Sequence, residues 1–540
     1  MAARFYLFGL IIPAILSLGC AQDPDGHAQP LFEYETRSLT EKGLETLLDE
    51  AGASDKAHLF AFDDGAEASS LGGALINTVP IAAPCYRNLG VYDAEKCAAV
   101  RTSFRNPYLH ENDPTSIFWP LYQGRTCMPT DDPNSGNCTR GGFPVYAVNV
   151  SNVGQIQLAV NFARNANLRL VIKNTGHCYL GKSSGAGALS IWTHNLKNLE
   201  YYPHLEIPGY SGPAMKVGAG VTVREVYAEA DRNDVSALGG ICESVGYAGG
   251  YIAGGGHTPL SGLYGMAADH VMALEVVTAD GRFITASPSE NTDLTSPTVP
   301  ASAFWEAMYT YFSLFIPFTD AGTYSWFTLT SDGAGSHTFS MDSFFAPNHT
   351  LASFSTLTKP LFDRLHDLNI PLTALTTTAH PAFYPAYNAT WGSNTPLNSA
   401  GGVSVPGNRL LPRRNWEDPA RFNATFAVLR RHAEAGRRLM GYHQAPRNRA
   451  NADNAVNSAF REVVAPESEG GGAYLNEANV DEPEWQSAFY GVHYGRLLEI
   501  KRERDPRGVF YATTAVGSEG WEIRDGERGV QTQDGRLCRV

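Results

Sequence analysis

Two short glycine-containing segments each present one nucleophilic side chain. The first is Lys173-Asn174-Thr175-Gly176-His177, and the second covers residues 240–246 with Cys242 inside it. The second segment continues through the glycines of residues 249–256 to His257. Consecutive backbone N–H groups in such turns converge on anions, because no Cβ blocks their approach. An imidazole and a thiol on neighbouring turns are what a flavin bonded at two ring positions would need.

Each of these features also has a plain structural interpretation. A glycine cluster alone is more often a tight turn, and a single histidine such as His177 is more often structural. The combination favours a cofactor site. A Rossmann site is disfavoured, because no Gly-x-Gly-x-x-Gly pattern opens a helix after a first strand. The His-Glu-x-x-His pattern of zinc enzymes is absent from the sequence, and we expect no metal site.

A β-α-β pattern leads into the first turn. Residues 145–150 have the composition of a strand, and Asn152 with Gln155 is typical of a helix start. Apolar residues then repeat at helical spacing, and a second strand over 168–172 leads to the turn that carries His177. Further strands are expected over 189–193, 214–217 and 274–278, and a helix over 221–233 precedes the Cys242 turn.

The chain of 540 residues is too long for one simple core, so two large lobes are expected. The sequence pattern changes after residue 300, where an aromatic-rich stretch over 304–318 precedes runs of alternating polar and apolar residues near 324–330 and 337–345. This pattern predicts a mixed α+β second lobe, and a single helix is expected over 485–503. The 41 Lys and Arg against 55 Asp and Glu give a net charge of −14, which argues against nucleic acid or an anionic membrane as a partner.

The N-terminus has the pattern of a cleaved leader. Arg4 precedes an apolar run over residues 5–18, and Gly19-Cys20-Ala21 offers a cleavage site, so residues 1–21 are predicted to be a signal peptide. Leu18-Gly19-Cys20 also matches a bacterial lipoprotein box. Five Asn-x-Ser/Thr sequons favour a eukaryotic secretory route instead, with N-glycans expected at some of Asn137, Asn149, Asn348, Asn388 and Asn423.

Seven cysteines remain if the leader is removed. Cys85 with Cys97 and Cys127 with Cys138 span short loops, so both pairs are predicted disulfides in an oxidising compartment. The odd count leaves at least one thiol without an internal partner. Cys242 is the best candidate for a special use, because it lies in a glycine-rich turn.

On these motifs the chain resembles secreted fungal members of the vanillyl-alcohol oxidase and berberine-bridge-enzyme-like flavoprotein superfamily. Within that superfamily it is most similar to the isoamyl-alcohol-oxidase-like branch. The resemblance covers roughly residues 80–540, and it is densest in residues 173–177, 183–187, 190–194, 254–261, 268–271, 276–282, 476–478 and 490–519.

The resemblance implies an α+β fold with a two-subdomain PCMH-type FAD-binding lobe and a mixed α+β substrate lobe built on an antiparallel sheet. The expected division is a signal peptide over 1–21, a disulfide-containing N-terminal extension over 22–139, an FAD-binding domain over 140–302, a substrate-binding lobe over 303–455 and a C-terminal segment over 456–540 that returns to the FAD-binding lobe.

The chain departs from the family pattern near residues 295–302. After residues 276–282 the family continues through a run of glycines and another strand that completes the FAD-binding domain, and neither is present here. Either the second FAD subdomain is truncated, or the sequence derives from a wrongly predicted gene model. Loss of a core strand would expose the backbone groups of its neighbours.

By resemblance, His177 would bond the 8α-methyl carbon of FAD, and Cys242 occupies the position where some members form a thioether with ring carbon 6. Both bonds withdraw electron density and make the flavin a better hydride acceptor. Cys178 departs from the family, where an acidic or small polar residue is usual, and it either pairs with Cys538 or is inert. The other implied cofactor-binding residues are Asn174, Thr175, Gly176, Cys178, Val245, Gly246, Gly249, Gly250, Gly255, Gly256, His257, Asp269, Val276 and Asn476.

A Tyr-x-Asn motif of the family's substrate face is matched by Tyr474-Leu475-Asn476. As tyrosinate, Tyr474 could take a hydroxyl proton while hydride moves to flavin N5, and O2 would reoxidise the flavin and form H2O2. The alternative is a buried tyrosine with a satisfied hydroxyl. The implied function is oxidation of an alcohol or another C–H group of a small molecule or secondary metabolite. A secreted glycoprotein of the same fold that has lost flavin, and an oligosaccharide oxidase, are the alternatives.

Overall fold

The computed structural model describes twelve stretches of the chain, with residues outside them left undescribed. The described stretches are residues 4–7, 74–207, 210–286, 305–331, 337–367, 376–392, 407–435, 437–446, 456–457, 459, 472–526 and 532–540. The shortened segment near 295–302 lies outside them. Within the described part, no helix has the length and apolar character needed to cross a membrane.

The first sheet carries the expected β-α-β unit. Its order is β2-β3-β5-β4, with β3 and β4 parallel to β5 and β2 antiparallel to β3. Helix α4 (Val153–Asn165) packs on this sheet, and the Asn152 side chain accepts a hydrogen bond from the Gln155 backbone at its start. The strands are β2 (Leu75–Asn77), β3 (Tyr146–Asn149), β4 (Leu170–Lys173) and β5 (Leu189–Trp192).

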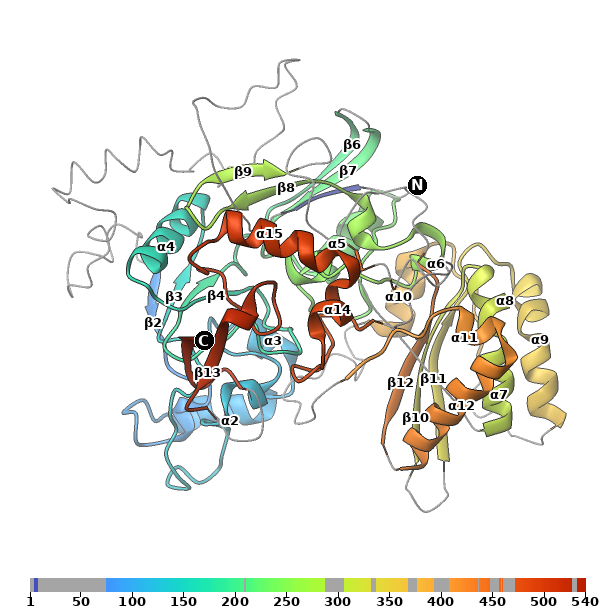
Figure 1. Ribbon diagram of the computed structural model, residues 1–540, viewed down its shortest axis with the longest axis horizontal. Helices are drawn as coiled ribbons and strands as arrows, with labels where there is room; N and C mark the ends of the chain where they lie inside the picture. Colours follow the sequence, from blue (N-terminus) through green and yellow to red (C-terminus); the bar gives the residue numbers. More distant parts are fainter. Residues whose placement is uncertain are drawn as a thin grey trace.

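A second sheet, together with the first, builds the first lobe of the protein (Figure 1). Its strand order is β6-β7-β1-β8-β9. The pairs β6–β7 and β8–β9 are antiparallel, whereas β1 lies between β7 and β8 and is parallel to both. The strands are β1 (Arg4–Leu7), β6 (Leu199–Ile207), β7 (Tyr210–Val217), β8 (Val271–Val277) and β9 (Phe283–Ala286).

Strand β1 comes from residues that the sequence assigns to a cleavable leader. Its hydrogen-bonded neighbours are Ala214–Lys216 on one side and residues 271–274 on the other. The two assignments exclude each other in a mature chain, because cleavage after residue 21 would remove β1. The facing edges of β7 and β8 would then need another partner.

The same lobe contains a helix and several short helical turns. These are α5 (Val223–Arg232), η4 (Tyr247–Tyr251), α6 (Ser261–Tyr264) and η5 (Ala267–His270). Thr222 and Glu225 form a capping box at the start of α5, consistent with the helix expected over 221–233.

The second lobe is built on the antiparallel sheet β11-β10-β12. Alternation along β10 sends Phe327 and Leu329 into a core shared with the helices on one face, and Tyr324 and Trp326 toward the first lobe. The elements are α7 (Trp305–Ser313), α8 (Phe315–Asp320), β10 (Tyr324–Ser331), β11 (His337–Phe345), α9 (Leu351–Asp367), α10 (Phe383–Trp391), α11 (Arg414–Glu417), α12 (Pro419–Glu434) and β12 (Leu439–His443).

A buried polar cluster holds the helices of this lobe to its sheet. His443 is 2% exposed, and its Nδ1 and Nε2 lie 2.7 and 3.0 Å from the hydroxyl oxygens of Ser325 and Thr323. Burial lowers the pKa of His443 to about 3. At pH values between this pKa and that of a free histidine, the unfolded chain therefore binds a proton that the folded chain does not.

We therefore expect acid to destabilise this lobe through His443. Because the folded-state pKa is depressed, the free energy of unfolding should fall by about 2–3 kcal/mol between about pH 7 and pH 4.5 on account of this residue. Urea unfolding at the two pH values, followed in the wild type and in His443→Gln, measures the difference. Equal losses in both proteins would assign the acid sensitivity elsewhere.

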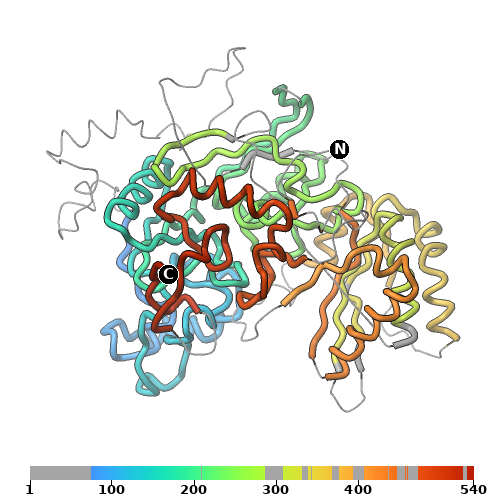
Figure 2. Tube along the Cα trace, viewed as in Figure 1, coloured from blue at the N-terminus to red at the C-terminus, as the bar shows by residue number. Residues whose placement is uncertain are grey.

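The C-terminal segment returns to the first lobe, as the red trace in Figure 2 shows. The helix expected over 485–503 is interrupted. It consists of α14 (Trp485–Tyr490), a 3-10 turn η8 (Gly491–His493) and α15 (Tyr494–Arg504). The cause is Gly491, whose φ of 57° and ψ of −138° are incompatible with a continuous helix. The turn η9 (Ser518–Gly520) and the hairpin of β13 (Trp521–Arg524) with β14 (Arg536–Arg539) follow.

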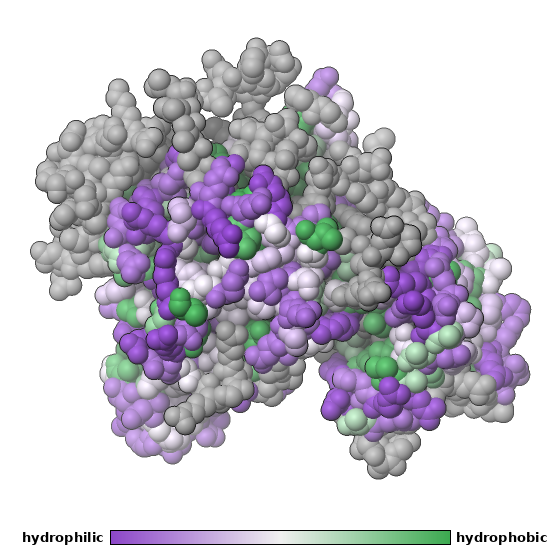
Figure 3. Space-filling model, viewed as in Figure 1, coloured by the Kyte–Doolittle hydropathy of each residue, from purple (hydrophilic) through white to green (hydrophobic). Residues whose placement is uncertain are grey.

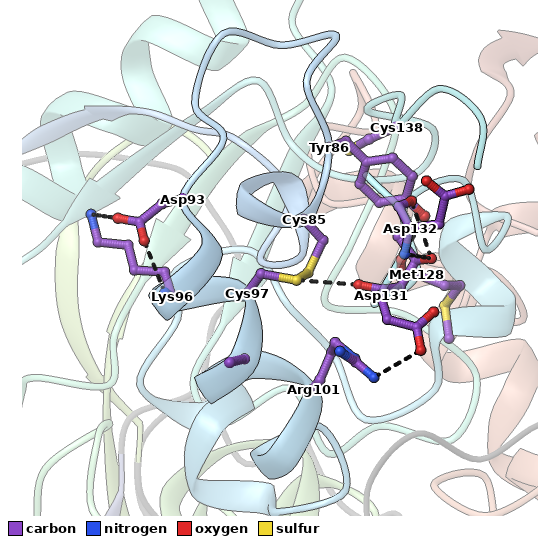
Figure 4. The surroundings of a disulfide bond; sticks show 12 residues. Cys85, Tyr86, Asp93, Lys96, Cys97, Arg101, Met128, Asp131, Asp132 and Cys138 are labelled. Carbon is purple, nitrogen blue, oxygen red and sulfur yellow. Dashed lines mark hydrogen bonds and ion pairs between the residues drawn. A yellow bond between two sulfur atoms is a disulfide. The ribbon is translucent and has the colours of Figure 1, made fainter. Parts of the chain in front are cut away.

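Both predicted disulfides are present. Cys85 bonds Cys97 and Cys127 bonds Cys138, and the surroundings of the first bond are drawn in Figure 4. The side chain of Arg101 reaches Asp131 across the same region. The local elements are η2 (Ala83–Cys85), α2 (Ala94–Ser103), α3 (Pro107–Glu111) and η3 (Pro120–Gln123).

The sequons differ in exposure. Asn137, Asn348, Asn388 and Asn423 are exposed, whereas Asn149 is half-buried in β3 and accepts a hydrogen bond from Asn195. Figure 3 shows hydrophilic side chains over much of the visible face of both lobes, with small separate hydrophobic groups between them.

Candidate active site

One large cavity, of about 2150 Å³, is lined by residues of both lobes. This volume exceeds that of an ordinary small-molecule site, and it has room for a dinucleotide and a substrate together. The first lobe contributes residues 174–179 and most of 240–254. The second lobe contributes Trp326 and Tyr442, and the C-terminal segment contributes residues 474–477 and part of α15.

The first wall is the turn that follows β4. Gly176 has a φ of +85°, and a Cβ there would lie 2.8 Å from the Ser116 carbonyl oxygen, so only glycine fits. The turn places His177 in the cavity wall, where its Nε2 is buried and has no hydrogen-bond partner among the described residues. Burial lowers the pKa of His177 to about 4, so the imidazole is neutral at physiological pH and its lone pair is available.

Asn174 connects this turn to the Cys242 turn. Its Nδ2 donates to the Ala219 carbonyl oxygen at 2.9 Å, and its Oδ1 lies 3.0 Å from Nδ1 of His194. A Cβ on Gly246 would lie 2.3 Å from Asn174 Nδ2, so the absence of a side chain at Gly246 lets the two turns meet. The structure therefore brings the two predicted nucleophiles to one cavity.

Both lobes hold the turn that carries Cys242. Tyr227 of α5 donates to the Gly240 carbonyl oxygen and Tyr387 of α10 donates to the Ile241 carbonyl oxygen, each at 3.0 Å. Cys242 lines the cavity. Burial, with the charges of Glu477 and Glu243, raises the pKa of its thiol to about 12, so the sulfur is protonated at neutral pH.

The glycines that follow leave open space. A Cβ on Gly249 would have no described atom within 4 Å, whereas a Cβ on Gly254 would lie 2.1 Å from Asn476 Nδ2. Asn476 also donates to the Gly250 carbonyl oxygen at 2.8 Å, which joins this loop to the C-terminal segment. A buried imidazole without a partner among the described residues, a cavity-facing thiol and an open glycine loop together fit a bound FAD.

Tyr474 lies in a turn closed by the hydrogen bond from the Glu477 backbone N–H to its carbonyl oxygen, at 2.9 Å. Its hydroxyl oxygen accepts from Asn476 Nδ2 at 3.0 Å, and a hydrogen bond from the Gly256 backbone also favours the ionised form. Burial and the charge of Glu477 outweigh these two bonds and raise the pKa of Tyr474. Tyr474 is therefore a neutral phenol at physiological pH.

Most predicted cofactor residues line the cavity, and four do not. The carbonyl oxygens of Gly255 and Gly256 accept from Ala268 and Ala267, and Asp269 accepts from the Met266 backbone. Val276 pairs with Ile284 inside the second sheet. The predicted residues in the wall are Asn174, Thr175, Gly176, His177, Cys178, Cys242, Val245, Gly246, Gly249, Gly250, His257, Tyr474 and Asn476.

Sequence reasoning assigned Cys178 and Cys538 as a possible pair. Neither forms a disulfide within the described part of the chain, and Cys178 lies in the cavity wall. Sequence reasoning also missed three residues of the site. Glu477 lies inside the 476–478 motif, and its ionisable side chain was a signal in the sequence that could have found it. Trp326 and Tyr442 lie on strands of the second lobe, and no local sequence pattern indicates that these strands contact the first lobe.

Comparison with known proteins places these features in a family. The FAD binding domain model matches residues 144–287, and the berberine and berberine-like model matches residues 473–517. The VAO-type flavoprotein oxidase VAO615 of Thermothelomyces thermophilus is 32% identical over 555 residues, which cover 87% of this chain and 92% of that protein. This chain belongs to the VAO-type FAD-linked oxidoreductases.

Other relatives agree with this membership. FAD-linked oxidoreductase orf1 of Neocamarosporium betae is 35% identical over 552 residues, covering 87% of this chain and 91% of that protein. The crystal structure of the VAO-type flavoprotein MtVAO615 from Myceliophthora thermophila C1 has a TM-score of 0.76 at 32% identity and covers 88% of this chain and 96% of that one. The expected superfamily and its α+β fold are thus confirmed, whereas the isoamyl-alcohol-oxidase-like branch stays a prediction.

Proposed function

We propose that this VAO-type oxidoreductase is an oxidase that removes hydride from an alcohol or another C–H group of a small molecule and passes the electrons to O2. The observation that carries this proposal is the convergence of His177, Cys242 and Tyr474 on one cavity. FAD, when bound, supplies the hydride acceptor at its N5 position.

The chain's own residues would hold FAD by two kinds of contact. His177 would bond the 8α-methyl carbon, and Cys242 would add a second bond at ring carbon 6. Gly246, Gly249 and Gly250 offer backbone to the pyrophosphate, because their surfaces in the cavity carry no side chains.

Tyr474 would bind the substrate hydroxyl and receive its proton. Asn476 and Gly256 donate to the tyrosine oxygen, so negative charge that develops there is stabilised. Replacing Tyr474 with phenylalanine should lower the rate of substrate oxidation by about 10²–10⁴. Flavin content and its attachment should not change, and an absorbance spectrum with stopped-flow flavin reduction separates these effects. An unchanged rate would make Tyr474 a structural residue.

A peroxide-coupled screen of the purified protein tests the reaction class. Primary and secondary alcohols are compared with mono- and oligosaccharides, and H2O2 formation from an alcohol is the expected result. Turnover of oligosaccharides alone would replace the alcohol with a carbohydrate substrate. A colourless protein that forms no peroxide would overturn the oxidase proposal in favour of a flavin-less glycoprotein.

We also propose secretion with glycosylation. Two disulfides and four exposed sequons support an oxidising secretory route. N-terminal sequencing of the secreted chain tests the predicted leader over residues 1–21. A start near residue 22 would mean that β1 is absent from the mature fold, whereas a start before Arg4 would mean that no leader is removed.

A further inference from the structure

One carboxylate stands in the part of the cavity where the predicted reaction takes place. Glu477 closes the same hydrogen-bonded turn as Tyr474, and its side chain is 28% exposed, in the cavity wall. Its Oε1 lies 3.4 Å from Nε2 of His257, which is 7% exposed. No sequence pattern assigned a role to this carboxylate.

His257 lies between the acid and the tyrosines. Its ring centroid is 5.3 Å from that of Tyr474 and 5.3 Å from that of Tyr442. The Tyr251 hydroxyl donates to the His257 carbonyl oxygen at 2.9 Å and fixes the backbone there. The imidazole therefore lies against both the Glu477 carboxylate and the ring of Tyr474.

The charge of Glu477 reaches groups from every wall of the site. It raises the pKa of Tyr474 and Cys242, and it opposes the lowering of the pKa of His177 by burial. The other groups whose pKa it raises are Tyr179, Tyr324 and Tyr442. These residues come from five separate segments, so the charge of Glu477 acts on groups from both lobes.

This arrangement creates a difficulty for Tyr474 as a final proton acceptor. A neutral phenol must lose its own proton before or while it takes another, and a nearby negative charge opposes a lasting tyrosinate. A group that takes the proton away from Tyr474 removes the difficulty.

We propose that Glu477, together with His257, accepts the proton that the substrate hydroxyl delivers to Tyr474; this inference rests on the proposed oxidase function. The proton of the substrate O–H bond moves to the Tyr474 oxygen, and the proton of Tyr474 moves to the Glu477–His257 pair. The C–H bond breaks with both electrons leaving as hydride to the flavin, and the substrate carbon–oxygen bond becomes a double bond. When O2 then takes the two electrons, the proton held by the pair completes H2O2.

The test compares Glu477→Gln with Glu499→Gln, which removes an exposed carboxylate on α15. The probe is the alcohol that gives the fastest peroxide formation in the wild type, and stopped-flow flavin reduction is followed across pH. Glu477→Gln should lower the rate about 10²–10⁴-fold at neutral pH. The lost rate should return at high pH, by about tenfold per pH unit, as Tyr474 itself ionises. Glu499→Gln should follow the wild type throughout.

A second readout needs no substrate. Alkaline titration of tyrosinate absorbance should show phenol ionisation at lower pH in Glu477→Gln than in the wild type, because a negative charge beside the tyrosines is gone. The double variant Glu477→Gln/Tyr474→Phe has no phenol at position 474. It should lack the ionisation of Tyr474 in the titration, and its rate should not recover at high pH.

The outcomes separate the two proposals. If the wild type oxidises no alcohol, the proposed function is contradicted, and the proton transfer to Glu477 and His257 is contradicted with it. An active wild type whose Glu477→Gln variant keeps its rate and its tyrosine titration overturns the proton pair alone. A variant that is slow at every pH, with an unchanged titration, also contradicts it, because Glu477 would then have a structural role.

Discussion

Replacing Gly249 with valine is expected to give a folded protein that purifies without flavin and forms no peroxide. The Cβ position of Gly249 faces the cavity with no described atom within 4 Å, so the new side chain meets no described neighbour. It would occupy the space in which we place the pyrophosphate, and it would block the approach of that group to the backbone.

The matched control is Gly495→Ala on α15. A Cβ at Gly495 also meets no described atom within 4 Å, but Gly495 does not line the cavity. The control should keep full flavin content and activity, and circular dichroism should show that both variants are folded. A yellow and active Gly249→Val protein would mean that the pyrophosphate does not bind at this loop.

The second large effect is expected from His177→Ala. Loss of the imidazole removes the proposed bond to the 8α carbon, so the reduction potential of the flavin should fall and oxidation of substrate should slow by about tenfold or more. The variant is compared with Cys242→Ala and with the double variant by acid precipitation, which releases flavin that has no covalent bond.

The three variants together assign each bond. If both bonds exist, each single variant keeps flavin in the pellet and the double variant releases it. If only the histidine bond exists, His177→Ala and the double variant release flavin, and Cys242→Ala does not. Flavin that stays in the pellet of the double variant would contradict both assignments.

The β-α-β unit before His177 could be predicted from the sequence, because the patterns that indicate its strands and helix lie within each element. Alternation and helical spacing indicated β3, α4 and β4, and the short glycine turn after β4 pointed to His177 as a ligand-facing residue. The helix over 485–503 was predicted as one piece, because its apolar spacing continues through Gly491. Only the backbone conformation of that glycine separates α14 from α15.

The rest of the site depends on contacts between distant segments. Asn174 touches the Gly246 turn, Tyr387 of the second lobe holds the backbone beside Cys242, and Glu477 meets His257 across more than two hundred residues. None of these contacts leaves a periodic signal in the sequence. The pairing of β1 with β7 and β8 is another such contact, and it falls on residues whose composition predicts a leader.

The most direct measurement is an absorbance spectrum of the purified wild-type protein before and after acid precipitation. We expect a flavin spectrum in the native protein and yellow colour that stays with the precipitate, which would establish covalent FAD in the cavity of His177 and Cys242. Yellow colour that passes to the supernatant would contradict the covalent bonds. A folded protein without flavin absorbance would contradict the oxidase function itself.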